Sequence, residues 1–394
     1  MFNLPRAFWL LFAGTLINRI GGFVIPFLAL YLTSHRGLPV AQAGLIVSLF
    51  GAGSFLAQVI GGELADRLGR KPVLLISFLA APAFVVSLGL AKDLGLIALC
   101  TFILGVFTDL YRPAVSAAIA DLIPSEDRPR AYGYIYWAIN LGYSIAPALA
   151  GLLAEYSYIT LFVGDGLTTL IFGLLVLFGF RETRPPEAHQ HASLTSPSNR
   201  IRQLKRAPIL LWFSFLTLFI GMIYMQGNVT LPVDMLSNGL GPREYGLAIS
   251  VNGILIVLLT IPITHQATRW SRFGTMSVSV ILTATGFGLT ALAGSLPFFA
   301  ACVAIWTLGE IAATSVAPSI IADLSPKESR GLFQGVYGSA FGLAFFFGPI
   351  LGGWTYEVFG AEILWGGCFS LGLVVSIAYF VLGKFARRSK EHET

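Results

Sequence analysis

A chain of 394 residues that is 55% hydrophobic and only 11% charged is not an ordinary soluble domain, in which about a quarter of the residues are charged. Its mean hydropathy of +0.76 places it in a lipid bilayer. The net charge of +5 could indicate nucleic-acid binding, but the positions of the basic residues, given below, exclude that class. Three cysteines lie within apolar runs and are expected to be packing residues rather than disulfide partners: Cys100, Cys302 and Cys368.

Twelve apolar runs are long enough to cross a bilayer, which takes about 20 helical residues. Because a backbone in lipid must satisfy its own hydrogen bonds, we expect all twelve to be helices and the protein to be an all-α integral membrane protein. The first run is too long for a cleavable signal peptide and lacks a cleavage site. The predicted spans are 7–32, 40–62, 73–91, 95–122, 131–154, 158–180, 208–235, 243–264, 274–293, 297–322, 331–356 and 362–383.

The basic residues gather on one side of these spans. Of the 25 lysines and arginines, 20 fall in the termini, the central polar stretch and the loops of that side, whereas the other side has only Arg36, Lys92 and Arg243. The positive-inside rule then predicts that both termini and the central stretch are cytoplasmic. The basic excess is therefore a topology signal and not a nucleic-acid footprint.

The longest polar stretch, Arg181 to Arg206, reads as a linker between two six-helix halves. Within it, His189 and His191 are expected to be solvated rather than metal-binding, because two histidines without further ligands do not make a site. The predicted organisation is an N-terminal half over 1–181, a linker over 182–207, a C-terminal half over 208–386 and a cytoplasmic tail over 387–394.

The two halves repeat with an offset of 202 residues. The segment IADLxPxExR occurs at 119–128 and again at 321–330, and the same offset relates Gly44 to Gly246 and Pro147 to Pro349. Because each half has six spans, the two copies have one orientation and are related by a pseudo-two-fold axis along the membrane normal.

A short charged segment, GGELADRLGRKP at 61–72, lies between the second and third spans. Together with the twelve helices and the repeat, it resembles the signature loop of the major facilitator superfamily of transporters. The resemblance implies that Asp66 and Arg70, with Asp121, latch the cytoplasmic ends of the halves in the outward-open state. Physically, Asp66 can accept from backbone amides at a helix N-terminus, and Arg70 can reach Asp121. A topology anchor without a gating role is the alternative.

Two further patterns bear on this family. In the second half, the copy of the charged segment has Thr268 in place of Asp66, so the latch should be asymmetric. Spans five and eleven contain 142–151 and 348–353, which resemble the G-P-x-x-G-G element of exporting antiporters. Small residues there would let helices of opposite halves pack closely, although generic membrane packing is an alternative explanation.

Ionisable residues inside the bilayer are costly and are therefore functional candidates. Near the middle of the spans are Arg19, Asp109, Arg112 and Glu310. Asp109 and Arg112 are three residues apart on one helix face and can pair. Counting Asp165 as well, the acids outnumber the bases by one, which favours a protonatable carboxylate. We expect Glu310 to be this proton-coupling residue, with Asp109 as a second candidate. Arg19 could join the Asp109 cluster or hold Glu310 in a structural lock.

The segment Thr307 to Ile311 resembles the proton-driven multidrug antiporters of Gram-positive bacteria, and so do Met225-Gln226 and 231–233. This resemblance implies a role for Glu310 in proton coupling and cation binding. The chain departs from that branch at Asn228, where the family has a carboxylate, and in its buried arginines. These departures argue against a preference for cationic drugs and make neutral or anionic substrates plausible.

Aromatic and polar residues of three helices suggest a cavity for bulky amphipathic ligands, although most membrane aromatics are packing residues. The candidate lining residues are Tyr136, Asn140, Tyr143, Tyr224, Gln226, Asn228, Phe341 and Phe345.

The sequence thus predicts proton-coupled export of small amphipathic compounds by a monomer in the plasma membrane. Its partners would be a small molecule, protons and the lipid bilayer, with no cofactor, metal or nucleic acid. The alternatives are a carrier of a specific metabolite (an anion, sugar, lipid or siderophore) and, more remotely, a non-transporting receptor. No phosphate-binding or zinc-hydrolase motif is present, so an enzyme is not expected.

Overall fold

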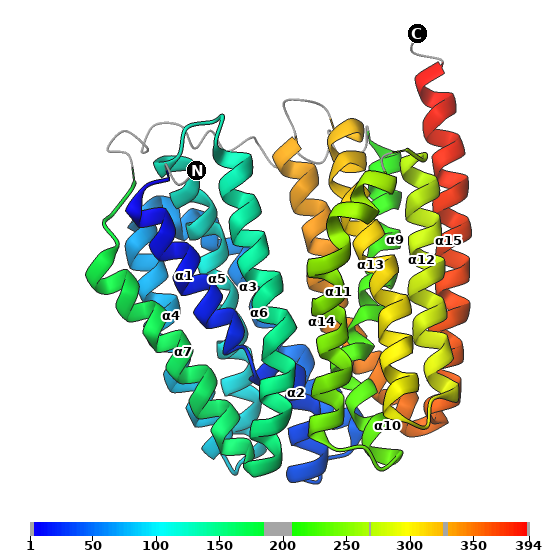
Figure 1. Cartoon of the computed structure of the whole chain (residues 1–394), viewed down its shortest axis with the longest axis horizontal. Coiled ribbons are helices and arrows are strands. Elements are labelled where there is room, and N and C mark those ends of the chain that lie inside the picture. The colour runs from blue at the N-terminus through cyan, green and yellow to red at the C-terminus, as the bar shows by residue number, and fades with distance from the viewer. Residues whose placement is uncertain (1–3, 185–206, 268, 326–329, 392–394) are drawn as a thin grey trace.

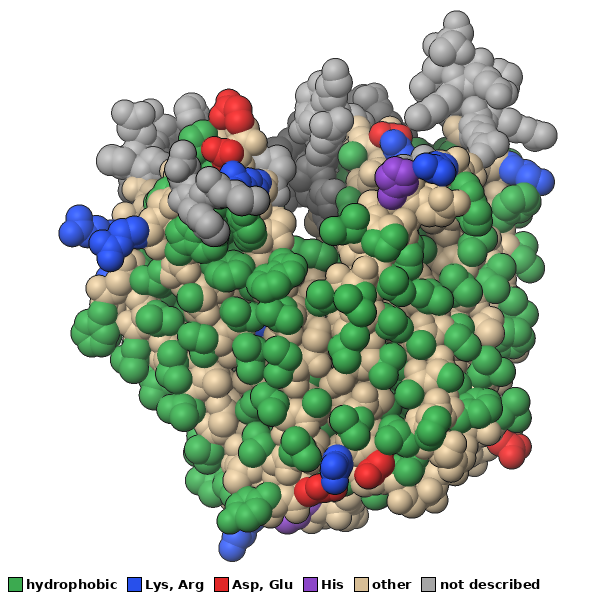
Figure 2. All heavy atoms as spheres, viewed as in Figure 1, with side chains coloured by type: hydrophobic (Ala, Val, Ile, Leu, Met, Phe, Trp, Pro, Cys, Tyr) green, Lys and Arg blue, Asp and Glu red, His purple; other side chains and the backbone are tan. Residues whose placement is uncertain are grey.

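The computed structural model describes residues 4–184, 207–267, 269–325 and 330–391, and every element in these ranges is a helix (Figure 1). Twelve helical segments of the described residues are long and apolar enough to cross a membrane. Hydrophobic side chains cover the middle of the molecule, and the charged side chains in view lie mainly toward its two ends (Figure 2). The chain is therefore a multi-pass membrane protein, and its all-α fold is the one predicted. Most of the predicted linker, including His189 and His191, lies outside the described residues.

The N-terminal half occupies the left of Figure 1 and the C-terminal half the right. The first half consists of α1 (Arg6–Ile20), α2 (Val24–Leu30) with the π-helical turn Tyr31–His35, α3 (Val40–Leu68), α4 (Arg70–Leu90), α5 (Leu94–Leu122), α6 (Arg128–Tyr156) and α7 (Tyr158–Gly179). The second consists of α9 (Pro208–Val229), α10 (Leu231–Ser237), α11 (Pro242–Ala267), α12 (Arg272–Leu289) with the 3₁₀ turn Thr290–Leu292, α13 (Leu296–Leu324), α14 (Arg330–Phe359) and α15 (Ala361–Glu391).

Two predicted spans are not continuous helices. The first is interrupted between α1 and α2, where the Asp165 carboxylate accepts the backbone N–H groups of Phe23 and Val24 at 3.1 and 3.0 Å. The seventh is divided at Thr230, just before Pro232, which has no N–H to continue the helix ladder. The helix α3 instead extends further than predicted, to Leu68, and α4 begins at Arg70, so the charged segment at 61–72 is helical except at Gly69.

The two halves meet through glycines related by the repeat. A Cβ added at Gly44 of α3 would lie 2.2 Å from the carbonyl oxygen of Pro349 in α14, and one at Gly246 of α11 would lie 2.2 Å from that of Pro147 in α6. No larger residue fits either position without moving a backbone. The prediction that small residues bring opposite halves together therefore has a direct geometric basis.

These contacts lie toward the end of the molecule opposite the two termini. There Tyr245 of α11 also donates to the carbonyl oxygen of Pro26 in α2, 3.0 Å away. Toward the other end, a Cβ added at Gly133 or Gly335 would meet nothing within 4 Å. The ribbons of the halves spread apart at this end, which carries the N and C labels (Figure 1). The structure is thus closed at one end and open at the end that bears the termini.

Candidate substrate and proton site

A cavity of about 340 Å³ lies between the two halves. We call it the central cavity. Its walls come from α6 on one side and from α9, α11, α13 and α14 on the other, with Met276 of α12. Six of the residues predicted to line a cavity are among its lining residues, which also include Trp306 and Tyr337: Asn140, Tyr143, Tyr224, Asn228, Phe341 and Phe345.

Two predicted lining residues are not part of this wall. Gln226 points to the opposite side of α9, because residues two apart on a helix lie about 200° apart around its axis. Its side-chain nitrogen donates to the carbonyl oxygen of Gly348 at 3.0 Å, and it lines a separate small cavity beside α14 and α15. The prediction for Gln226 was wrong. Tyr136 lies one turn from Asn140 and is 47% exposed; it is close to Thr314 and Glu310 of the wall but does not itself line the cavity.

Glu310 of α13 is the single carboxylate among the residues that line the central cavity, and that lining contains no lysine or arginine. Its Oε2 accepts a hydrogen bond of 2.7 Å from the side-chain nitrogen of Asn252 on α11. The same nitrogen donates to Thr307 one turn away, at 3.0 Å. The partner of Glu310 is therefore a neutral amide, and the lock between Arg19 and Glu310 weighed from the sequence is not formed here.

A second, smaller cavity of about 130 Å³ is lined by residues of the N-terminal half together with Phe345 of α14. We call it the N-half cavity. Asp109 and Arg112 of α5 both line it and form an ion pair of 2.6 Å, as their spacing predicts. Asp109 is 6% exposed and also accepts a hydrogen bond from Ser54 of α3. The Arg112 side chain is 55% exposed, so the pair presents its positive end to the open interior.

Arg19, in the last turn of α1, also lines the N-half cavity. Its guanidinium donates to the hydroxyl of Tyr111 and lies 5.7 Å from the centre of that ring. Space for it depends on Gly142 of α6, where an added Cβ would lie 2.4 Å from the Arg19 Cβ. The structure thus places Arg19 with the Asp109–Arg112 pair and not beside Glu310.

The two cavities are neighbours, because Tyr143 and Phe345 line both of them. Tyr143 lies within electrostatic reach of Arg19, Arg112, Asp109 and Glu310. Tyr143 therefore separates two different environments. On the side of the central cavity, the Glu310 carboxylate lies among aromatic rings, and on the side of the N-half cavity lie the guanidinium groups of Arg19 and Arg112.

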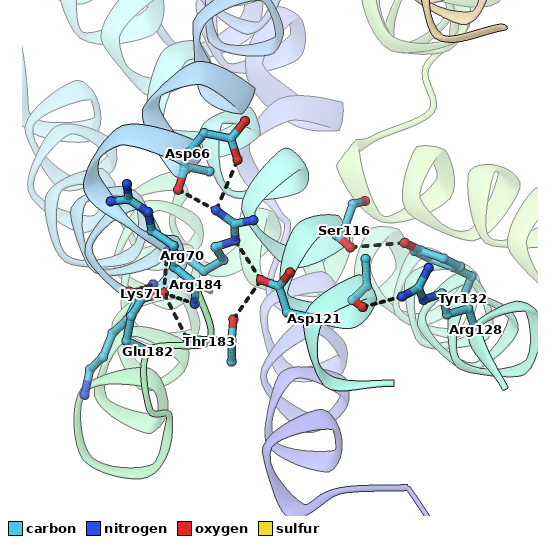
Figure 3. Close-up of polar contacts among 12 residues, drawn as sticks. Asp66, Arg70, Lys71, Ser116, Asp121, Arg128, Tyr132, Glu182, Thr183 and Arg184 are labelled. Atoms are coloured by element: carbon cyan, nitrogen blue, oxygen red, sulfur yellow. Dashed lines mark hydrogen bonds and ion pairs between the residues drawn. The ribbon is translucent and has the colours of Figure 1, made fainter. Parts of the chain in front are cut away.

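The predicted gate residues form one network at the open end (Figure 3). Arg70, at the start of α4, makes ion pairs of 3.1 Å with Asp66 and 2.8 Å with Asp121. All three residues belong to the N-terminal half, so in this conformation the network does not join the halves. Arg70 is 6% exposed, whereas the side chain of its partner Asp66 is 66% exposed.

The backbone amides at the start of α4 are bound by a residue that the sequence analysis missed. Glu182, and not Asp66, accepts from the N–H groups of Arg70 and Lys71 at 2.9 and 3.0 Å (Figure 3). Burial alone would raise the pKa of Glu182, but these bonds and those from the backbone of Thr183 and Arg184 lower it below its ordinary value. The turn before α4 favours Gly69, because its φ of 104° is strained for a residue with a side chain.

The C-terminal half contains a simpler copy of this network. Arg272 pairs with Asp323, and these two residues correspond to Arg70 and Asp121 at the offset of 202. The N-terminus of α12 is capped by the Ser271 hydroxyl, which accepts from the N–H of Gly274 at 3.2 Å. Thr268, which takes the place of Asp66, lies outside the described residues.

The signal for Asn252 was present in the sequence, because an amide inside an apolar span needs a partner. Glu182 had no such signal, since it stands in a polar stretch that reads as a linker. Its role depends on the three-dimensional meeting of the end of α7 with the start of α4.

Twelve membrane-crossing helices in two repeated halves around a central cavity define a membrane transporter and not an enzyme. The chain belongs to the Major Facilitator Superfamily, whose profile matches residues 11–236 and 227–394.

Its relatives include the uncharacterised MFS-type transporter YttB of Bacillus subtilis, 28% identical over 96% of this chain and 95% of the relative. The Na(+), Li(+), K(+)/H(+) antiporter of Planococcus maritimus is 26% identical over 87% and 90% of the two chains. The class H tetracycline resistance protein of Pasteurella multocida is 25% identical over 93% and 92%. A solved structure of the nucleoside transporter NupG has the same fold, with a TM-score of 0.81 at 14% identity over 95% of this chain and 98% of that one.

Proposed function

We propose that this chain is a proton-coupled antiporter that exports small amphipathic compounds by alternating access. The observation that carries the proposal is the environment of Glu310: a partly buried carboxylate with a neutral partner in a cavity lined by aromatic residues. Aromatic walls suit bulky apolar compounds, and a carboxylate without a nearby base can hold a proton or a cationic group in turn.

The proposed cycle uses the two ends of the molecule alternately. A proton that enters from the side closed here neutralises Glu310, with Asp109 as the second acceptor, and favours the conformation open at the end bearing the termini. Release of the proton there restores the charge and the affinity for substrate. A membrane potential adds about 2.3 kcal/mol per charge per 100 mV, enough to drive export when positive charge moves inward.

The relatives support both parts of this proposal. One is named for exchange of alkali cations against protons, and another for resistance to tetracycline. Exchange against protons and removal of an amphipathic compound are the two properties proposed for this chain. Neither relative exceeds 26% identity, so the assignment here depends on the Glu310 site and on the experiment below.

The proposal includes an orientation and a gate. Both termini lie in the cytoplasm of a plasma membrane, as the basic loops favour, and the protein acts as a monomer. When the open end closes, Asp66 reaches the C-terminal half while Arg70 and Asp121 hold it in place. The exposure of the Asp66 side chain in the present conformation leaves its carboxylate available for that contact.

The direct test is a panel of compounds applied to efflux-deficient cells with and without the protein. The panel contains lipophilic cations, neutral amphiphiles and amphipathic acids, each measured with and without a protonophore. We expect lower accumulation of at least one amphipathic compound and loss of this effect with the protonophore. Unchanged accumulation of every compound, or uptake in place of export, would contradict the proposal.

A carrier of a specific metabolic anion is the second candidate. Arg19 and Arg112 favour it, because both guanidinium groups line the N-half cavity. Such a carrier would move polar anions and leave the amphipathic compounds of the panel unaffected.

A further inference from the structure

The inference concerns the chemical class of the substrate, and it rests on the proposed export function. The two cavities that meet at Tyr143 differ in character. The central cavity is mainly aromatic and aliphatic with Glu310, whereas the N-half cavity contains four ionisable residues: Arg19, Asp109, Arg112 and Asp165. A molecule that occupies both cavities would therefore meet an apolar wall at one end and charged groups at the other.

Both carboxylates of the N-half cavity are already engaged. Asp109 pairs with Arg112 at 2.6 Å and accepts from Ser54. Asp165 accepts the two backbone N–H groups that begin α2. Neither carboxylate forms an ion pair with Arg19 in the described part of the chain.

Arg19 is consequently the cation of this cavity whose bonding is incomplete. Its one described hydrogen-bond acceptor is the neutral hydroxyl of Tyr111. Its Nε atom is buried and has no hydrogen-bond partner. A buried donor without an acceptor is destabilising, and the cost is higher for a charged group. This free-energy cost is removed when a hydrogen-bond acceptor enters the N-half cavity and binds the Arg19 guanidinium.

The shape of a guanidinium group determines which acceptor fits best. Its N–H donors lie in one plane and match the two oxygens of a carboxylate or a sulfonate, and such charge-assisted bonds are stronger than neutral ones. Arg112 is a weaker candidate, because its Nε is already paired with Asp109.

We propose that the substrate carries an acidic group that binds Arg19, while its apolar body occupies the central cavity. The transported class is then an amphipathic acid or zwitterion rather than a simple lipophilic cation. Tyr143, at the junction of the two cavities, lies alongside the molecule between its two ends.

The test is equilibrium binding to the purified full-length protein in lipid nanodiscs, measured by calorimetry. Two matched pairs of probes are used: naphthylacetate with naphthylacetamide, and decanoate with decanamide. Within each pair the apolar body is the same and only the charge differs. We expect the wild-type protein to bind each acid about tenfold more tightly than its amide, the gain typical of a charge-assisted hydrogen bond.

Substitutions at Arg19 should remove this preference and leave the apolar contribution intact. In Arg19→Gln the ratio of acid to amide affinity falls to about one, while the affinity for the amide is unchanged, which also shows that the cavity is intact. Arg19→Lys should retain part of the preference for the acid over the amide, and it replaces the Gln variant in the test if that variant fails to fold. The matched control is Arg36→Gln, since Arg36 donates to the Ala91 carbonyl outside both cavities.

A wild-type protein that binds the acids no better than the amides, or binds neither, would overturn the proposal, and so would an unchanged ratio in Arg19→Gln. These outcomes are separate from failure of the export function. Proton-coupled export that depends on Glu310 could persist without any preference for acids, and a preference for acids that depends on Arg19 could exist without coupling to protons.

Discussion

At the scale of single residues, the buried charges are placed by neighbours from several helices. Asp109 is fixed by Arg112 on its own helix and by Ser54 on α3. Glu310 is bound by Asn252 alone among its described partners. Neutralising Asp109 would leave the Arg112 guanidinium without its ion-pair partner, whereas neutralising Glu310 would leave no cation unpaired. This contrast is why we place proton coupling first at Glu310.

Glu182 makes the stability of the protein depend on pH. Its pKa is lowered in the folded state, so its carboxylate contributes stability that is complete above the unfolded pKa of about 4.3. That contribution is lost as the pH falls toward the folded value. We expect Glu182→Gln to lower the melting temperature at pH 7 and to flatten its decline as the pH falls below about 4.3.

Differential scanning fluorimetry in detergent over this pH range measures the effect. The control is Glu63→Gln, which removes an exposed carboxylate paired only with Arg67 in the described structure. The control should follow the wild-type profile. If the melting temperature of Glu182→Gln declined with pH as steeply as that of the wild type, the hydrogen bonds from the start of α4 to Glu182 would not stabilise the folded protein.

At the scale of helices, the N-terminus of α3 lies at the closed end of the molecule and is bound there by the C-terminal half. The Glu357 carboxylate of α14 accepts from the backbone N–H of Ala41 at 2.7 Å. A negative charge at a helix N-terminus is stabilising, so this contact favours the closed form of that end. The residue related to Glu357 by the repeat is Glu155, which makes no hydrogen bond to α11 in the described part of the chain.

We expect Glu357→Gln to weaken closure of this end by about 0.5–1 kcal/mol, a shift of a few-fold in the two populations. Glu155→Gln is the matched control and should leave the populations unchanged. Distances between spin labels at the outer ends of α3 and α14 measure the two forms. An equal shift in both variants would mean that the contact with Ala41 is not what holds the end closed.

Much of the helical architecture follows from the sequence, because each span needs a long apolar run and each half repeats the other. The interruption after Ile20 does not follow, since it depends on Asp165, which lies far away in the chain. The candidate site likewise combines contacts that the sequence predicts with contacts that it does not. Asp109 and Arg112 are paired by helical spacing alone, whereas the partners of Arg19 and Glu310 come from other helices. Gln226 was misplaced because a cluster in sequence was taken for a shared helix face.

At the scale of the whole molecule, the helix contacts between the halves follow the two-fold repeat, whereas the residues of the candidate site do not. The glycine contacts of α3 with α14 and of α11 with α6 are equivalent by the offset of 202. Arg19 and Arg112 lie in the N-terminal half, and Glu310 with most of the aromatic wall lies in the C-terminal half. Rocking of one half against the other around the central cavity would change the distance between these groups, and we propose that this motion couples the charge of Glu310 to the conformation.

Substrate-driven proton exchange tests this coupling most directly. Proteoliposomes with a pH-sensitive dye inside are given a compound that the protein exports, and proton movement is compared between wild type and Glu310→Gln. The matched control is Asp323→Asn, an exposed acid paired with Arg272 outside both cavities. We predict that Glu310→Gln abolishes the exchange while Asp323→Asn retains it. Full substrate-driven exchange in Glu310→Gln would contradict the account.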